Sequence, residues 1–144
     1  MQTAAEFGAA TDEVDAAAAA ALQVNRTDLR ILGIVEAEPG TTATAVARAV
    51  SLSPAATTTA IQRLVASGYL NRDSSNEDRR RVVLSLTGAA RRIINQIYEP
   101  LAAAGLNEIE GYSEWELSLI DDFLSRGVVV QYKQASRIRS MKRT

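Results

Sequence analysis

Residues 42–87 are TATAVARAVSLSPAATTTAIQRLVASGYLNRDSSNEDRRRVVLSLT, and this stretch decides the fold of the chain. Thr42 is a residue type that begins helices, because its hydroxyl can accept a free backbone N–H. Ser51-Leu52 then forms a short turn, after which Ser53 caps a second helix with Pro54 at its first position. The stretch therefore predicts a helix, a tight turn and a second helix.

A β-hairpin is expected directly after these helices. Gly68 is suited to end the second helix, which we expect over residues 53–67. Residues 69–72 and 81–86 have strand propensity, and turn-forming residues separate them. Such a hairpin is a wing, here residues 73–81. Two helices and a wing fit a DNA duplex, with the second helix in the major groove and the wing at the minor groove.

The two faces of the second helix differ in character. Four residues recur at helical spacing and are expected to face a core: Thr57, Ile61, Leu64 and Val65. The opposite face carries small or polar residues, namely Ala55, Ala56, Thr58, Thr59, Gln62 and Arg63. That second face is the one we expect to meet DNA.

Composition excludes several classes of protein. The 144 residues include no cysteine and no histidine, which removes thiol chemistry, the usual general base and the commonest metal ligands. We therefore expect no enzyme, no cofactor and no metal site. No apolar stretch is long enough to span a membrane, and no signal peptide begins the chain, so we expect no membrane partner and a cytoplasmic protein.

The net charge of −1 hides an uneven distribution. Residues 39–92 carry eight arginines against three acids, whereas residues 1–38 carry two bases against seven acids. Residues 93–125 have seven acids and no base, and residues 126–144 have six bases and no acid. Positive charge thus gathers on the helix-turn-helix and the wing, where DNA phosphates would lie.

Two helices are expected before the winged segment. Residues 3–24 are alanine-rich and strongly helix-forming, and one stripe of this helix is apolar: Phe7, Ala10, Val14, Ala17, Ala21 and Leu22. Asn25 followed by Asp28 predicts the start of a helix over residues 26–38. Its inward residues are expected to be Leu29, Ile31, Leu32 and Val35.

Two further helices are expected after the wing. Thr87 caps the first of them, and Pro100 is expected to kink or split it. Residues 105–112 are then expected to form an acidic connector. Ser113 and Glu116 form a capping box that begins the last helix, with a bend plausible near Gly127.

The first and last helices carry more apolar surface than a small winged domain can cover. Burial against a second copy of the chain accounts for that surface best, although a plain amphipathic helix over its own domain is the alternative for residues 3–24. We therefore expect a mostly α (α+β) homodimer. Residues 26–87 would form the winged helix-turn-helix DNA-binding region, and residues 1–25 and 88–144 the helical dimerisation region.

The order and spacing of these parts resemble the MarR (multiple antibiotic resistance regulator) family of bacterial transcription factors. Asp78-Arg79-Arg80 followed by Val82-Val83-Leu84-Ser85-Leu86-Thr87-Gly88 is similar to the family's wing motif. Further matches are Leu29-x-Ile31-Leu32, Leu52-Ser53 and Arg63-Leu64-x-x-x-Gly68-Tyr69-Leu70-x-Arg72. The resemblance covers essentially the whole chain.

The resemblance implies a homodimer with two winged helix-turn-helix lobes above a helical dimerisation domain. It also implies repression through palindromic DNA sites. Many family members release DNA when a small aromatic ligand enters a pocket between the two domains, so the resemblance implies such an effector as well. The absence of cysteine excludes the family's peroxide-sensing branch by its usual chemistry.

The recognition helix departs from the family at two positions. Pro54 and Thr59 stand where many members carry basic residues. The groove-facing surface therefore has no bidentate donor for guanine, and we expect it to contact thymine methyl groups. Specificity would then depend on the wing and on DNA shape.

The expected DNA-binding residues come from the recognition helix and the wing: Ser53, Pro54, Ala55, Ala56, Thr58, Thr59, Arg63, Arg72, Asp78, Arg79, Arg80 and Arg81. Within the wing, Asp78 would orient an arginine, Arg80 would enter the minor groove, and Arg79 or Arg81 would meet phosphate. Arg63 would also meet phosphate. The alternative function is a winged-helix scaffold that binds protein rather than DNA, because the recognition helix is poor in arginine.

Overall fold

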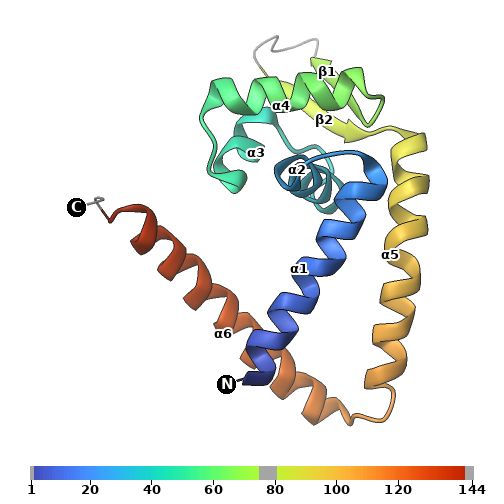
Figure 1. Ribbon diagram of the computed structural model, residues 1–144, viewed down its shortest axis with the longest axis vertical. Coiled ribbons are helices and arrows are strands. Elements are labelled where there is room, and N and C mark those ends of the chain that lie inside the picture. Colours follow the sequence, from blue (N-terminus) through green and yellow to red (C-terminus); the bar gives the residue numbers. More distant parts are fainter. Residues whose placement is uncertain (1, 75–80, 142–144) are drawn as a thin grey trace. The chain divides into compact units, whose positions relative to one another are not determined.

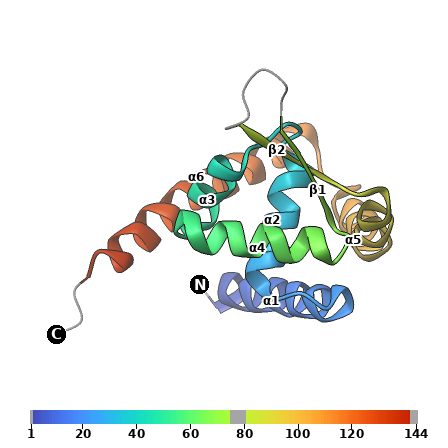
Figure 2. The same ribbon diagram turned by 90° about the horizontal axis from the view of Figure 1, so that it is seen from above.

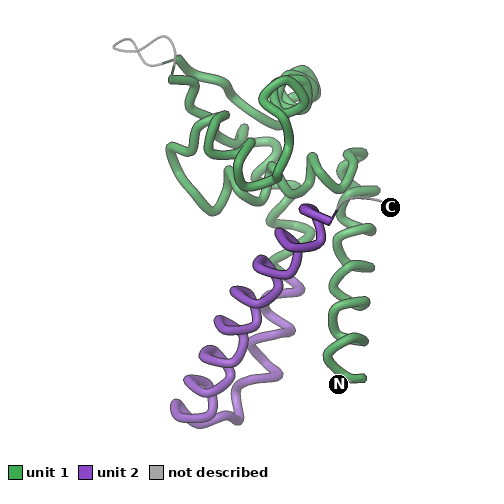
Figure 3. The backbone as a smooth tube through the Cα atoms, turned by 90° about the vertical axis from the view of Figure 1, so that its left-hand side faces the viewer, with its two compact units in different colours: residues 1–99 green, residues 100–144 purple. Residues whose placement is uncertain are grey.

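The computed structural model describes residues 2–74 and 81–141. The chain divides into two compact units, residues 1–99 and 100–144 (Figure 3), and each is described separately below. In chain order the elements are α1 (Gln2–Leu22), α2 (Arg26–Ala37), α3 (Ala43–Val50), α4 (Pro54–Ala66), β1 (Leu70–Ser74), β2 (Val82–Leu86), α5 (Gly88–Ile109) and α6 (Glu114–Arg139). This is the mostly helical, winged helix-turn-helix fold expected from the sequence.

The helix-turn-helix of unit 1 is built by the predicted caps. The Thr42 hydroxyl accepts the N–H of Ala45 at 3.2 Å, and the Ser53 hydroxyl accepts the N–H of Ala56 at 3.2 Å. Between the two helices, Ser51 adopts a left-handed conformation with φ 56°. This reversal ends α3 and lets α4 begin three residues later, so the two helices pack against each other.

Gly68 ends α4 as predicted. It has φ 77° and donates its N–H to the carbonyl of Val65, while the next N–H, of Tyr69, reaches the carbonyl of Leu64 at 2.9 Å. These two bonds are the pattern of a glycine-terminated helix, and they satisfy carbonyls that the helix leaves free. The Tyr69 hydroxyl then donates to the carbonyl of Leu22 at 2.6 Å, which ties the start of the hairpin to the end of α1.

The wing strands are antiparallel, with Leu70 opposite Leu86 and Ser74 opposite Val82 (Figure 2). β2 also pairs with the segment before α3, where the N–H of Leu84 donates to the carbonyl of Thr41 at 3.0 Å. β1 extends to Ser74, so the prediction that the turn begins at Asp73 is wrong by two residues. The cross-strand bonds to β2 override the turn preference of Asp73 and Ser74.

The core of unit 1 lies between α2, α3, α4 and the sheet. Its fully buried side chains come from every one of these elements and from the end of α1: Leu22, Ile31, Leu32, Val46, Ile61, Leu64, Leu70 and Leu84. The predicted inward face of α2 is confirmed, since Leu29 and Val35 are buried too. β2 packs against α2 and α3, which fixes the base of the wing to the helix-turn-helix.

The predicted apolar stripe of α1 is mostly not buried within the chain itself. The residues that α1 buries in its own chain are Ala18, Ala19 and Leu22, and Phe7 is 71% exposed. The packing partner α2 begins only four residues after α1 ends, so the residues that α1 buries lie in its C-terminal turns, and the side chain of Arg26 reaches back only to Asp12 and Asp15. Most residues of the predicted stripe are therefore exposed to solvent in the single chain.

The first of the two C-terminal helices is longer than predicted. α5 runs without interruption through Pro100 (Figure 1), so the predicted split there is wrong. It also extends to Ile109 and takes in most of the predicted connector, because Ala102, Ala103 and Ala104 favour helix strongly. α6 begins at the predicted capping box and continues through Gly127. Within Glu114–Arg139, all of which the structure describes, no residue of α6 is buried.

Candidate nucleic-acid interface

The residues of α4 that the sequence predicts to face the DNA groove are exposed. Ser53, Pro54, Ala55, Ala56, Thr58 and Thr59 are all exposed. Thr57, Ile61 and Leu64 are buried as predicted, whereas Val65 is 36% exposed and its place in the core is taken by Ala60. The prediction for Val65 failed because the buried positions of α4 recur at three- and four-residue spacing as 57, 60, 61 and 64, which leaves Val65 at the edge of the buried stripe.

The hydroxyl groups of the exposed threonines already have partners inside the helix. Thr58 Oγ1 donates to the carbonyl of Pro54 at 2.9 Å, and Thr59 Oγ1 donates to the carbonyl of Ala55 at 3.1 Å. Each hydroxyl therefore offers only lone pairs to an incoming ligand, beside its methyl group. This surface consists of methyl groups, the Pro54 ring and hydrogen-bond acceptors.

Arg63 has a specific partner within unit 1. Its Nη2 lies 2.7 Å from Asp28 Oδ1 and its Nε lies 2.9 Å from Asp28 Oδ2, which makes a bidentate ion pair between α4 and α2. The hydrogen bond and the charge of Asp28 raise the pKa of Arg63. The Asp28 side chain is 3% exposed and that of Arg63 is 47% exposed. Sequence reasoning used Asp28 only as part of a helix start. The missed signal is an acid on the inward face of α2, next to Leu29 and Leu32.

The other predicted contact residues belong to the wing. Arg72 is exposed on β1, opposite Leu84 in β2, and Arg81 is exposed just before β2 begins. Asp78, Arg79 and Arg80 lie outside the described residues. The structure thus places Arg72 and Arg81 on the same hairpin, at the two strands that lead into its tip.

A groove of about 570 Å³ lies in unit 1, between α1, α2 and the first half of α5. It is lined by both apolar and charged side chains: Asp15, Arg26, Thr27, Leu29, Arg30, Gly33, Ile34, Ala37, Glu38 and Tyr98. Sequence reasoning did not predict these residues, because they come from three helices whose packing no local pattern specifies.

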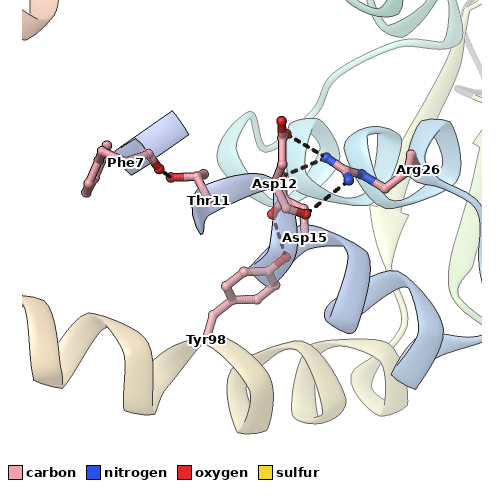
Figure 4. Close-up of polar contacts among 6 residues, drawn as sticks. All are labelled: Phe7, Thr11, Asp12, Asp15, Arg26 and Tyr98. Carbon is pink, nitrogen blue, oxygen red and sulfur yellow. Dashed lines mark hydrogen bonds and ion pairs between the residues drawn. The ribbon is translucent and has the colours of Figure 1, made fainter. Parts of the chain in front are cut away.

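Arg26 is the centre of the polar contacts at this groove (Figure 4). Its Nη2 lies 3.1 Å from Asp12 Oδ1 and 3.6 Å from Asp15 Oδ2, and its Nη1 donates to the Asp12 carbonyl at 3.1 Å. Tyr98 donates to Asp15 Oδ1 at 3.5 Å. Burial, and then the neighbouring Asp15 carboxylate, raise the pKa of the Tyr98 hydroxyl. The tyrosine is therefore a neutral donor at neutral pH.

Comparisons with known proteins agree with this geometry. Residues 24–71 match the family model described as winged helix-turn-helix DNA-binding. An uncharacterized HTH-type transcriptional regulator of Bacillus subtilis (strain 168), YcgE, is 30% identical over 123 residues, which cover 85% of this chain and 80% of that protein.

Solved structures show the same fold at low identity. MarR from E. coli is 17% identical with a TM-score of 0.60, over 87% of this chain and 93% of that one. A MepR mutant from a multidrug-resistant S. aureus clinical isolate is 15% identical with a TM-score of 0.73, over 91% and 98%. Another MepR mutant was solved bound to an oligodeoxyribonucleotide.

The chain belongs to the MarR family. It is a DNA-binding transcriptional regulator of the MarR type, and this family is not one of enzymes. Within residues 2–74 and 81–141, no group of three or more carboxylates is placed to hold a metal ion. No helix of that same part of the chain is long and apolar enough to cross a membrane.

Proposed function

We propose that this MarR-family chain acts in the cytoplasm as a homodimeric repressor of a palindromic operator. The observation that carries the proposal is the face of α4 from Ser53 to Thr59, which is exposed, free of large apolar side chains and placed directly after a helix-turn-helix reversal. A helix so presented enters the major groove in this class of protein. The wing, residues 73–81, would lie at the minor groove, with Arg80 inserted in it and Asp78 orienting an arginine.

The exposed residues 53–59 of α4 would distinguish bases by their shape and by contact with the methyl group of thymine. Because the hydroxyls of Thr58 and Thr59 donate inside the helix, the surface offers methyl groups to thymine and acceptors to the amino groups of adenine or cytosine. A guanine has no bidentate donor among the exposed residues 53–59. Thymine-containing half-sites are therefore the proposed target of α4.

The unburied apolar surface of the helices supports dimerisation. α6 exposes Trp115, Leu119 and Phe123, and Leu101 and Leu106 of α5 are exposed in the same unit. On α1, Phe7 is exposed as well. Trp115, Leu119 and Phe123 recur every four positions and so lie on one face of α6, and an exposed apolar helix face of this kind is typical of an interface. A second copy presents the same face, so a two-fold dimer covers both at once.

The groove around Arg26 and Tyr98 is the proposed effector site. It combines an apolar wall, including Leu29 and Ile34, with a guanidinium and a phenol hydroxyl at one side. A small aromatic ligand with an acidic group would fill the apolar part and compete with Asp12 and Asp15 for Arg26. Such competition would loosen the contact between α1 and α2, and thereby release DNA.

Binding to duplex DNA at increasing salt tests the proposal. A labelled duplex from the intergenic region upstream of the protein's own gene is titrated with the protein and followed by fluorescence anisotropy. Log affinity should fall linearly with log salt, by about 0.9 for each phosphate neutralised. The variant Arg80→Ala should lose operator binding while remaining a dimer.

The alternative is a winged-helix scaffold that binds protein, which the lack of an arginine among residues 53–59 favours. No retardation of any duplex at low salt would support the scaffold and refute the repressor. Unchanged affinity of Arg80→Ala would refute only the role given to the wing.

A further inference from the structure

The ion pair between Asp28 and Arg63 joins two helices that are far apart in the chain. Asp28 lies in the first turn of α2, and Arg63 lies in the last turn of α4. Both Asp28 oxygens are engaged by the guanidinium, at 2.7 and 2.9 Å. A planar, two-point bond of this kind restricts both the distance and the angle between the groups it joins.

Asp28 is held in place from its own helix. The Asn25 side chain accepts the backbone N–H of Asp28 at 2.7 Å, so the first turn of α2 is closed around it. Negative charge is also favoured at a helix N-terminus. The carboxylate itself is 3% exposed, and a buried carboxylate requires a partner. Arg63 is that partner, and it comes from the recognition helix.

The remaining contacts of α4 come mainly from the packing of one buried face. The residues that α4 buries are Thr57, Ala60, Ile61 and Leu64, of which two are small. Burial of this face selects which side of α4 meets the core, but each apolar contact is non-directional and tolerates small changes in the angle of the helix. The bidentate bond is directional, and it acts at the end of α4 opposite to the Ser53 cap.

We propose that Asp28 is a positioning residue for DNA binding, which fixes the orientation of α4 through Arg63. Arg63 then serves this bond and does not neutralise a phosphate. The inference rests on the proposed function, because it presumes that the face of α4 meets the operator. It assigns a role in DNA binding to a side chain that DNA cannot reach.

The two roles for Arg63 give opposite results in a salt titration. If Arg63 neutralised a phosphate, Arg63→Gln would make the slope of log affinity against log salt shallower by about 0.9. Asp28→Asn would then leave affinity unchanged or raise it, since it frees the guanidinium. If the pair positions α4, both variants weaken binding and neither changes the slope.

The experiment compares Asp28→Asn, Arg63→Gln and the double variant with the wild type. The probe is a labelled duplex enriched by the wild-type protein from a random-sequence library. We expect about a tenfold loss for each single variant and no further loss in the double variant, because residues acting through one bond are not additive. Glu36→Gln is the matched control, since Glu36 pairs with Arg91 at 3.4 Å in an exposed contact between α2 and α5. It should bind as the wild type does.

A second measurement needs no DNA. Amide hydrogen exchange of the free protein should be about tenfold faster in residues 57–66 of Asp28→Asn than in the wild type, with α5 unchanged. Asp28→Asn is the safer of the two single variants. It leaves the half-exposed Arg63 side chain to be solvated by water, whereas Arg63→Gln leaves the buried Asp28 carboxylate without a partner. Circular dichroism confirms that each variant folds.

Three results would overturn the inference: wild-type affinity in Asp28→Asn, a shallower salt slope in Arg63→Gln, or unchanged exchange in α4. A loss in Glu36→Gln equal to that in Asp28→Asn would also overturn it, since the effect would not be specific to α4. Failure of the wild type to enrich any duplex would instead refute the proposed function, and the exchange measurement would still decide whether the pair orders α4.

Discussion

Gly68 ends the recognition helix in a conformation that disfavours any side chain. Its φ is 77°, and no atom lies within 4 Å of the position that a Cβ would take. The cost of a substitution therefore comes from backbone strain alone, about 1–2 kcal/mol for an L-residue in the left-handed region. We expect Gly68→Ala to lower the free energy of unfolding by that amount, measured by urea denaturation.

The matched control for this prediction is Gly33→Ala. Gly33 lies inside α2, is exposed, and also has no atom within 4 Å of the position that an alanine methyl group would occupy. Alanine in a helix interior is favoured over glycine by about 0.5–1 kcal/mol, so this variant should be more stable than the wild type. Equal effects of the two substitutions would show that the conformation of Gly68 is not the cause.

Thr58 tests how the exposed face of α4 distinguishes bases. Thr58→Ser keeps the hydroxyl that donates to Pro54 and removes the methyl group, whereas Thr58→Val keeps a methyl group and removes the hydroxyl. One buried methyl group is worth about 0.8 kcal/mol, or roughly fourfold in affinity. We expect Thr58→Ser to bind the operator with roughly fourfold lower affinity and Thr58→Val to bind it as tightly as the wild type.

Replacing operator thymines by deoxyuridine in the same anisotropy assay completes the test. The wild type should lose affinity for the substituted duplex, and Thr58→Ser should lose less, because its methyl contact is already absent. A wild type indifferent to deoxyuridine would contradict thymine-methyl contact by α4.

At the scale of elements, the sequence predicts what local chemistry determines. The caps Thr42, Ser53 and Ser113 each begin their helix as predicted, because a side-chain acceptor and a free N–H lie within a few residues of each other. Gly68 ends α4 for a similarly local reason. Helix boundaries of this kind require no knowledge of the rest of the molecule.

Features that depend on distant partners could not be predicted in the same way. Which side of α1 is buried depends on where α2 turns back, and the length of β1 depends on cross-strand bonds to β2. The partner of Arg63 lies 35 residues away. An acid on the apolar face of a predicted helix indicates that a partner exists, but it does not say which arginine supplies it.

The capping box of α6 predicts a pH-dependent helix. The Ser113 backbone N–H donates to Glu116 Oε2 at 2.8 Å, and the Ser113 hydroxyl does so at 2.7 Å. These bonds, the backbone one first, lower the pKa of Glu116. A lowered folded pKa means that the stabilisation is complete above the unfolded pKa and is lost as pH falls through the folded pKa.

Glu116→Gln checks this reasoning. Glutamine can still accept the Ser113 N–H but does not ionise in this range, so the variant should keep the helix while losing that acid-dependent step. The difference in helical circular dichroism between the two proteins is followed as the pH is lowered. Glu114→Gln is the control, because Glu114 lies between the two residues of the box but takes no part in their bonds. Identical acid titrations of the wild type and Glu116→Gln would refute the role of the carboxylate.

At the scale of the whole molecule, the two units differ in how much they bury. Unit 1 has a core drawn from α1 to α4, both strands and the start of α5. In unit 2, the 26 residues of α6 bury none of their side chains. A long helix does not stay folded on propensity alone in most sequences, and its stability comes from an apolar face that packs on something. We therefore expect the apolar face of α6 to pack against a partner in another molecule.

Phe123→Asp tests whether that partner is a second copy. Phe123 is 70% exposed on α6, and an aspartate buried in an apolar interface would carry an uncompensated charge. We expect sedimentation equilibrium to show a dimer for the wild type and a monomer for Phe123→Asp. Ser118→Asp adds the same charge at an exposed polar position of α6 and should remain dimeric. Because one lobe reaches one half-site, the monomer should also lose most of its affinity for a palindromic duplex. If Phe123→Asp remains a dimer and binds DNA with unchanged affinity, this part of α6 does not lie in the dimer interface.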